Sequence, residues 1–321
     1  MFKVIDLGPE GKPQESDDAD LVAPPAPGRL RWIDLIRADP SSLDLLRRRF
    51  NFHPLALEDC ASFDARSKFD EYADHLFLVL HSFSPAPEDP SLFQVHEIHA
   101  FLGESYLVTV HDNRVPATEE VWRRAATDAT VLRRGTSWAL YMTVDAMIDA
   151  TFPVLDLLMK RVENVEELVL SDARRRTLGD IFTTRSTLVS LRRVMRPVRD
   201  VVGVLTRRAE PPLSERTALY FRDIQDHVLR CLETMDEAEQ LIANTIDAHR
   251  SAVATRTNEI MAKLTIFSAI FLPLGFIVGF WGQNFHSLPF GSSGTMVALS
   301  LVLCVVVPVV LLTWFWWKRW L

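Results

Sequence analysis

The chain has 321 residues, of which 48% are hydrophobic and 24% charged, and its formal net charge is −7. This acidic balance argues against nucleic-acid binding, which normally shows as a basic patch or stripe. Cys60, Cys231 and Cys304 lie far apart without disulfide or zinc-ligand spacing, so we expect small apolar side chains in a reduced compartment.

The N-terminal part predicts a soluble domain behind a short tail. Residues 1–28 are rich in proline and acidic side chains and predict a flexible lead-in, and without a signal-peptide pattern we expect them in the cytoplasm. Residues 29–135 alternate between strand and helix patterns and predict an α/β (α+β) domain. Its expected helices are residues 41–50, 54–60 and 116–132, and its expected strands are residues 75–83, 93–102 and 105–111, the last two joined as a hairpin by Gly103 and Glu104.

From residue 136 to residue 258 the pattern is helical. We expect one helix over about residues 136–170, interrupted or bent near Pro153, and a second over about residues 173–206, bent at Pro197. A third forms a long stalk over about residues 213–258. Because no proline or glycine occurs between Leu213 and Leu272, this stalk is expected to continue into the following segment without a break.

The stalk carries a seam of apolar residues at alternating spacings of three and four. A seam of this kind packs either against helices of the same chain or against other copies of the chain, and the pattern alone does not decide between them. Its residues are Phe221, Ile224, Val228, Cys231, Met235, Ala238, Ile242 and Thr245.

Residues 259–321 predict a transmembrane hairpin. No Asp, Glu, Lys or Arg occurs from residue 264 to residue 317, and two apolar runs, about 261–281 and 295–317, approach or exceed the roughly 20 residues that cross a bilayer. The connection between them is neutral and rich in turn-forming residues. Basic residues flank the hairpin at both ends, which predicts a multi-pass protein of the cell (inner) membrane with both termini in the cytoplasm. These residues are Arg256, Lys263, Lys318 and Arg319.

Small and polar residues continue the seam spacing along the first span. In membrane helices such positions usually face other helices or a water-filled path. Two spans per chain cannot enclose a path, so we expect a symmetric oligomer. The stripe comprises Asn258, Met261, Thr265, Ser268, Leu272, Gly275 and Gly279.

Five segments along the chain carry distinctive motifs: FHPLALEDC at 52–60, RSKFDEYADHLFLVLH at 66–81, FLGESYLVTVHD at 101–112, YFRDIQDH at 220–227 and Gly282-Gln283-Asn284 after the first span. Together they resemble the CorA family of divalent-cation channels, whose hallmark is Gly-Met-Asn after the first of two C-terminal spans. The resemblance implies a homopentameric channel with a funnel-shaped cytosolic domain and a stalk helix that continues as the pore helix.

The resemblance also implies roles for particular residues. The selectivity filter would be Gly282, Gln283 and Asn284, with the Asn284 amide contacting Mg²⁺ through the water of the ion. In the YFRD match, Asp223 would bind a regulatory Mg²⁺ between subunits, with Asp226 as a weaker candidate. No cofactor is expected besides Mg²⁺ as the transported and regulatory ion. The residues lining the path and its gate would be Asn258, Met261, Leu264, Leu272 and Gly275.

Departures from the family pattern leave the function open between alternatives. Gln283 replaces the usual Met, Phe290 follows Pro289 where an acid is common, and Gly275 replaces a hydroxyl residue. The first alternative is Mg²⁺ uptake, with Co²⁺ and Ni²⁺, down the membrane potential and gated by cytosolic Mg²⁺. The second is a zinc transporter of the same fold, with or without proton coupling, and the third is a membrane-anchored cytosolic sensor or enzyme.

The expected partners are membrane lipid, further copies of the chain and divalent metal ions, without nucleic acid.

His96 and His99 flank Glu97 in the strand expected over residues 93–102. These two histidines would face opposite sides of a strand, which excludes a shared metal ion. We therefore expect ordinary strand histidines there, and no enzymatic activity.

Overall fold

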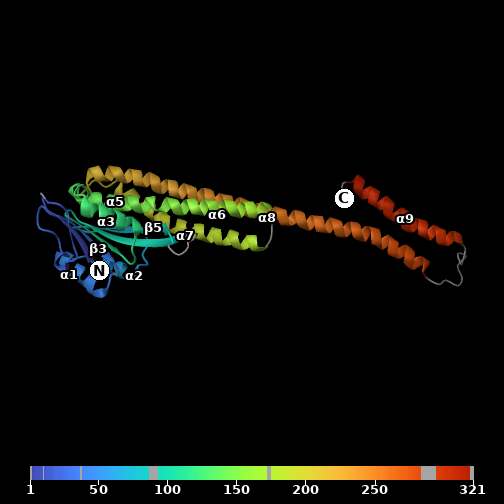
Figure 1. The fold of residues 1–321 in the computed structure, drawn as a ribbon, viewed down its shortest axis with the longest axis horizontal. Coiled ribbons are helices and arrows are strands. Elements are labelled where there is room, and N and C mark those ends of the chain that lie inside the picture. Colours follow the sequence, from blue (N-terminus) through green and yellow to red (C-terminus); the bar gives the residue numbers. More distant parts are fainter. Residues whose placement is uncertain are drawn as a thin grey trace. The chain divides into compact units, whose positions relative to one another are not determined.

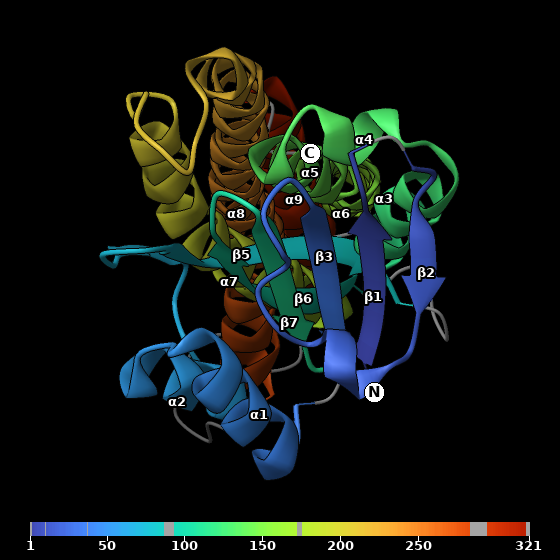
Figure 2. The ribbon, with the colours of Figure 1, turned by 90° about the vertical axis from the view of Figure 1, so that its left-hand side faces the viewer.

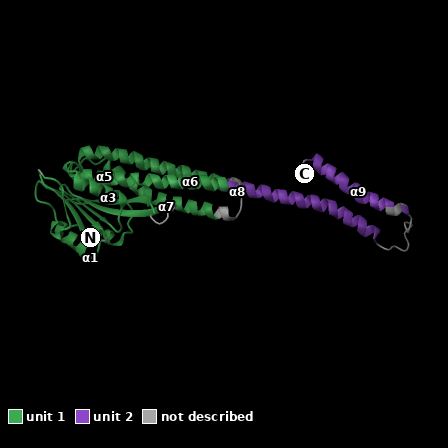
Figure 3. Ribbon diagram, in the orientation of Figure 1, with its two compact units in different colours: residues 1–168, 174–245 green, residues 169–173, 246–321 purple. Residues whose placement is uncertain are grey.

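The computed structural model describes residues 2–9, 11–36, 38–86, 93–171, 175–282 and 294–318 (Figure 1). The chain forms two compact units, coloured separately in Figure 3. The first contains residues 1–168 and 174–245, and the second contains residues 169–173 and 246–321. One helix, α8 (Glu215–Trp281), contributes residues to both units.

The first unit is built on a mixed sheet. In the described part of the chain this sheet has seven strands in the order β2-β1-β3-β7-β6-β5-β4. Neighbouring strands are antiparallel except β3 and β7, which are parallel. The strands expected over residues 75–83, 93–102 and 105–111 are confirmed. The bounds are β1 Phe2–Leu7, β2 Gln14–Ser16, β3 Leu30–Ile36, β4 Lys68–Glu71, β5 Leu76–Pro85, β6 Phe93–Leu102 and β7 Tyr106–His111.

The hairpin between β6 and β7 depends on Gly103. Its backbone N–H donates to the Tyr106 carbonyl at 2.9 Å, which closes the turn. A Cβ atom added at Gly103 would lie 2.5 Å from the Tyr106 ring, so only glycine allows this approach. The expected hairpin is confirmed.

The prediction of a flexible lead-in over residues 1–28 is wrong. β1 pairs with β3 along its whole length and buries Val4 and Ile5 completely, and β2 forms the edge of the sheet beside it. The buried Arg31 holds Asp6 with its Nε at 3.0 Å from Oδ1. The prolines of this segment lie in the connections between these strands, whereas the apolar residues of β1 join the core.

Helices cover both faces of the sheet (Figure 2). α1 (Pro40–Phe50) and α2 (Pro54–Ser62) enclose the main apolar core on one face. α3 (Pro116–Thr127), α4 (Thr130–Arg133) and α5 (Thr136–Asp149) lie on the other. The helix expected over residues 116–132 is therefore two helices. Asp128 leaves helical conformation at φ −115 and ψ 106, and its carboxylate accepts the Thr130 N–H at 2.9 Å, which starts the second helix.

The long helices follow the expected pattern. α6 (Thr151–Ser171) begins just after α5 ends, so the expected interruption near Pro153 is confirmed, and α7 is Arg175–Leu205. The eight seam residues of α8, from Phe221 to Thr245, are at most 2% exposed within a single chain. The Phe221 ring lies 5.9 Å from the Tyr141 ring of α5. The seam therefore packs against helices of its own chain.

The second unit contains the end of α8 and the helix α9 (Gly294–Trp317). Among the described residues, α8 and α9 each contain a stretch long and apolar enough to cross a membrane, and only 6% of each stretch is buried. A core helix of a soluble protein would be mostly buried. Two such exposed apolar helices match the expected transmembrane hairpin.

Candidate ion path and cation site

The expected path-lining residues lie on one face of α8. Their spacing keeps them within about a third of the helix circumference. Met261, Leu264 and Leu272 are 61%, 63% and 73% exposed, and Asn258 and Gly275 are exposed as well. Thr265 on the same face satisfies its hydroxyl by donating to the Met261 carbonyl at 2.8 Å. The described residues of one chain therefore leave this face without apolar cover.

Gly282 closes the C-terminal end of α8. Its N–H donates to the Val278 carbonyl at 2.8 Å, and a Cβ at this position would lie 2.9 Å from that same carbonyl oxygen. A larger residue would force the backbone to shift at the point where the helix ends. Gln283 and Asn284, the other two residues of the expected filter, lie outside the described residues, as does Phe290.

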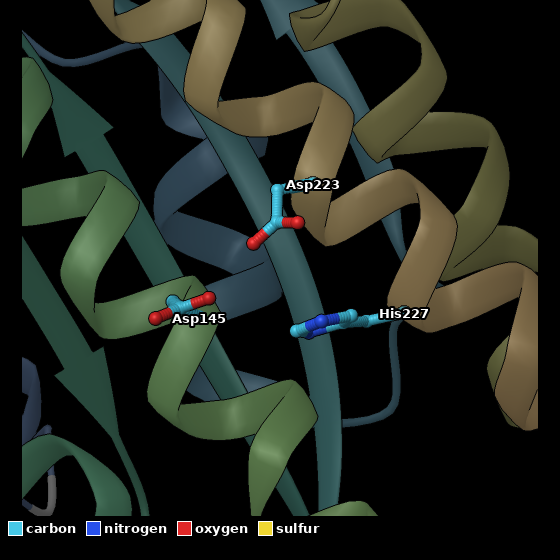
Figure 4. A group of neighbouring side chains, drawn as sticks. All are labelled: Asp145, Asp223 and His227. Atoms are coloured by element: carbon cyan, nitrogen blue, oxygen red, sulfur yellow. The ribbon is translucent and has the colours of Figure 1, made fainter.

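The stalk part of α8 contributes to a cluster of potential metal ligands (Figure 4). Asp223 and His227 on α8 face Asp145 on α5, and one ligand atom from each lies within 4.8 Å of the other two. Asp145 and His227 are half-buried, whereas Asp223 is exposed. Two ligands on opposite sides of a divalent ion are about 4 to 5 Å apart, so one ion can contact all three.

The cluster is strongly acidic. The pKa of Asp145 is raised to about 6, mainly by burial and then by the charges of Asp149 and Asp223, against the opposing effect of His227. Asp149 lies 3.5 Å from His227 Nδ1. Burial, followed by the charges of Asp145 and Asp223, raises the pKa of Tyr141 to about 12. A bound cation would relieve the repulsion that these shifts report.

The donor set fits a divalent cation. Carboxylate oxygens suit Mg²⁺, which usually keeps several of its waters, and an imidazole nitrogen also suits Co²⁺, Ni²⁺ and Zn²⁺. Within the ranges that the structure describes, this is the one group of three such residues whose ligand atoms come this close. Because the ligands come from α5 and α8, an ion bound here would connect these two helices.

Two other expectations concern residues near the cluster and on the sheet. Asp226 is exposed on α8 and does not join the cluster.

On β6, His96 Nε2 lies 2.7 Å from Ser84 Oγ, whereas Glu97 Oε1 lies 2.7 Å from His99 Nε2. The two histidines therefore have separate partners, as expected for opposite strand faces.

Two residues of the cluster were missed from the sequence. His227 follows Asp223 by one helical turn, and this spacing of four places both on one face of the stalk, which was an available signal. Asp145 lies on another helix, and nothing in the local pattern pairs it with the stalk. Asp223 was expected to act between subunits, but it meets Asp145 and His227 within one chain.

The fold and its two exposed apolar helices define a membrane protein. The model of the family described as CorA-like Mg²⁺ transporter protein matches residues 27–319, and the chain belongs to that family. It is therefore a membrane-embedded transporter of divalent metal ions.

Individual relatives cover most of the chain. YfjQ of Bacillus subtilis is 31% identical over 291 residues, which are 90% of this chain and 89% of YfjQ. The cobalt/magnesium transport protein CorA of Thermotoga maritima is 28% identical and aligns with 85% of this chain and 78% of its own length. The zinc transport protein ZntB of Yersinia enterocolitica is 22% identical and aligns with 90% of this chain and 88% of its own.

Among solved structures, the complete CorA magnesium transporter of Methanocaldococcus jannaschii has the same fold. Its TM-score is 0.85 at 20% identity, with 99% of this chain and 98% of that chain covered. The expected architecture, an α/β domain followed by long helices and an apolar hairpin, is thereby confirmed.

Proposed function

We propose that the chain forms a homopentameric channel through which Mg²⁺, and also Co²⁺ and Ni²⁺, enters the cytoplasm, and that cytosolic Mg²⁺ closes this channel. One observation carries the proposal. α8 is a single helix of 67 residues that includes both Asp223 of the cation cluster and Met261 of the expected gate. A change in the position of the stalk is therefore passed to the gate through continuous backbone.

The path itself requires several copies of the chain. The exposed α8 face with Met261 and Leu264 has no cover within one chain, and five copies around an axis would bring five such faces together. Rings of Met261 and Leu264 would form an apolar constriction that closes by losing its water. The basic flanks of the hairpin support an orientation with both termini, and the first unit, in the cytoplasm.

Selectivity would come from the segment after Gly282. Mg²⁺ gives up its water reluctantly, so a ring of Asn284 amide oxygens would accept hydrogen bonds from the hydrated ion. A ring of carboxylates would bind the ion too tightly for rapid release. The membrane potential supplies about 2.3 kcal/mol per charge at 100 mV, hence about 4.6 kcal/mol for a divalent ion, without a further energy source or cofactor.

Closure would follow from cation binding at Asp145, Asp223 and His227. An ion there connects α5 to α8 and neutralises the crowded carboxylates. Without the ion, the repulsion between Asp145 and Asp223 favours separation of the two helices. The ion thus stabilises one position of the stalk over another, which is the requirement for a ligand that shifts a conformational equilibrium.

A zinc transporter of the same fold is the second candidate. Gln283 in place of Met and Phe290 in place of the acid after Pro289 depart from the pattern of the magnesium channels. The imidazole of His227 in the cluster suits a softer ion than Mg²⁺. The overall likeness to ZntB also supports it. This candidate predicts Zn²⁺ flux that responds to a pH gradient.

Flux into liposomes separates the functions. Purified protein is reconstituted, and entry of Mg²⁺ or Zn²⁺ is followed with a trapped indicator dye at a fixed potential. Mg²⁺ entry that Asn284→Ala abolishes supports the first function, whereas Zn²⁺ entry that depends on a pH gradient supports the second. A protein that passes no divalent ion contradicts both and leaves a membrane-anchored sensor.

A further inference from the structure

The outward face of α7 carries arginines that make no ion pair with any described residue of their own chain. Arg192 forms ion pairs within its own chain: it pairs with Glu239 and lies 2.7 Å from Asp236, both on α8. Arg193 and Arg196 are exposed, and neither makes an ion pair with any described residue. Val189, 42% exposed, lies on the same face. Arginine beside exposed apolar side chains is the composition of a protein interface.

A complementary face lies on α8. Glu233 and Glu237 are one helical turn apart, both are exposed, and within the described residues neither has an ion-pair partner. Both point away from the seam, whose central residues Cys231 and Met235 are completely buried. These two carboxylates are therefore free to meet a second molecule.

The two faces match in level along the helices. The pair Arg192–Asp236 and the approach of Gln225 to Gly203 show that α7 and α8 run antiparallel, because the residue number on one rises as it falls on the other. The same register puts Arg193 level with Met235, two residues or about 3 Å from Glu237 at a rise of 1.5 Å per residue. It puts Arg196 level with Leu232, one residue from Glu233.

We propose that α7 of one copy packs against α8 of the next copy, with Arg193 opposite Glu237 and Arg196 opposite Glu233. The proposal rests on the cyclic oligomer of the proposed function. Rotation about an axis along the stalk moves no copy along that axis. Two residues at the same height within one chain are therefore also at the same height when one of them belongs to the neighbouring copy. The contact joins two different faces and repeats around the ring, as closure requires.

A competing acidic face lies on α6. Asp156 and Glu163 are exposed there, but Lys160 lies between them on the same face and would repel the arginines. α8 presents its two carboxylates without an intervening lysine. We therefore assign the contact to α8 and use α6 as the comparison in the test.

Charge exchange in the full-length protein tests the contact. Native mass spectrometry in detergent measures the assembled fraction of R193E/R196E, of E233R/E237R and of the variant that combines all four substitutions. Like charges across each contact should lower the assembled fraction about tenfold in each double variant, and the combined variant should recover most of it. R193E/R196E combined with D156R/E163R should stay dissociated.

Cross-linking provides a second measurement that does not depend on the size of the charge effect. Arg193→Cys and Glu237→Cys in a Cys304→Ala background, treated with a short bis-maleimide, should give a ladder of bands beyond the dimer on a denaturing gel. The two remaining native cysteines are buried. A circular-dichroism melt establishes which variants are folded.

Three results would overturn the inference: cross-links confined to single chains, recovery through the α6 residues instead, or folded double variants that assemble as the wild type does. Wild-type ion flux is measured in parallel. If the wild type passes ions but the charge substitutions leave the assembled fraction unchanged, the contact alone is refuted. If the wild type passes no ions, the proposed function is refuted.

Discussion

His111 at the end of β7 is 1% exposed, yet both of its ring nitrogens face acceptors. Nδ1 lies 2.6 Å from the Asn113 carbonyl, and Nε2 lies 3.0 Å from the Asp34 carboxylate. Both nitrogens must then carry protons, so the ring is a buried cation paired with Asp34. Burial lowers the pKa of His111, but the hydrogen bond and charge of Asp34 outweigh it, and the net shift is upward.

This pair predicts a pH-dependent contribution to stability. Because the folded pKa exceeds the unfolded value, the contribution is complete below about pH 6.5 and is lost as the pH rises through the folded pKa. We expect the melting temperature of the wild type to exceed that of Asp34→Asn most at about pH 6, and the difference to shrink toward about pH 9.

Thermal melts of both proteins across this range check the prediction. The difference between the proteins is used because the neighbouring His96 has a lowered pKa and contributes a slope of opposite sign. A difference that stays constant with pH would show that His111 is not charged in the folded protein.

The cation cluster also shows what a residue pattern can and cannot reveal. Asp223 was identified through the YFRD match, and His227 was within reach because it lies one turn further along the same helix. Asp145 could not be identified from the sequence, because carboxylates that meet across two helices leave no periodic signal in either helix. A site assembled from distant segments becomes visible only when the packing of α5 on α8 is known.

At the scale of elements, alternation and helical periodicity predicted the adjacent strands β5, β6 and β7 and the long helices. They missed β1, β2, β3 and β4. β1 is as long as β7, but it is identified by its pairing with β3 rather than by its own residues. Nor could periodicity assign a partner to the α8 seam. The same spacing suits an internal core and an intermolecular coiled coil, and only the burial of Phe221 and its neighbours within one chain decides the matter.

The internal seam predicts a clear difference between two positions on α8. Phe221 is completely buried, so Phe221→Ala should lower the free energy of unfolding by about 3 to 5 kcal/mol. Leu229 on the outer side is 39% exposed, and Leu229→Ala should cost less than about 1 kcal/mol. Chemical denaturation followed by circular dichroism measures both. Equal losses would contradict the assignment of the seam to the core of a single chain.

At the scale of the whole molecule, the continuity of α8 would connect the proposed regulation to transport. The helix carries Asp223 in the first unit and Met261 in the second with no break between them. Pro273 lies inside the helix beyond both residues, so it does not interrupt the segment that joins them. A break introduced between cluster and gate should therefore uncouple the two.

Such a break can be made with a pair of glycines. Ala252→Gly combined with Ala254→Gly lies between the cluster and the gate, and each glycine in a helix interior costs about 1 kcal/mol relative to alanine. We expect this variant to pass Mg²⁺ but to respond less to cytosolic Mg²⁺, as measured by liposome flux at several internal concentrations. Unchanged regulation would argue against transmission through α8.

The most direct test of the account is Mg²⁺ flux against rising Mg²⁺ on the cytosolic face, compared between the wild type and Asp223→Asn. Asp226→Asn is the matched control, since Asp226 is an exposed acid one turn away that does not join the cluster. The account predicts that wild type and control close as cytosolic Mg²⁺ rises, whereas Asp223→Asn stays open to much higher concentrations. Identical closure of all three proteins, or no Mg²⁺ flux through any of them, would contradict it.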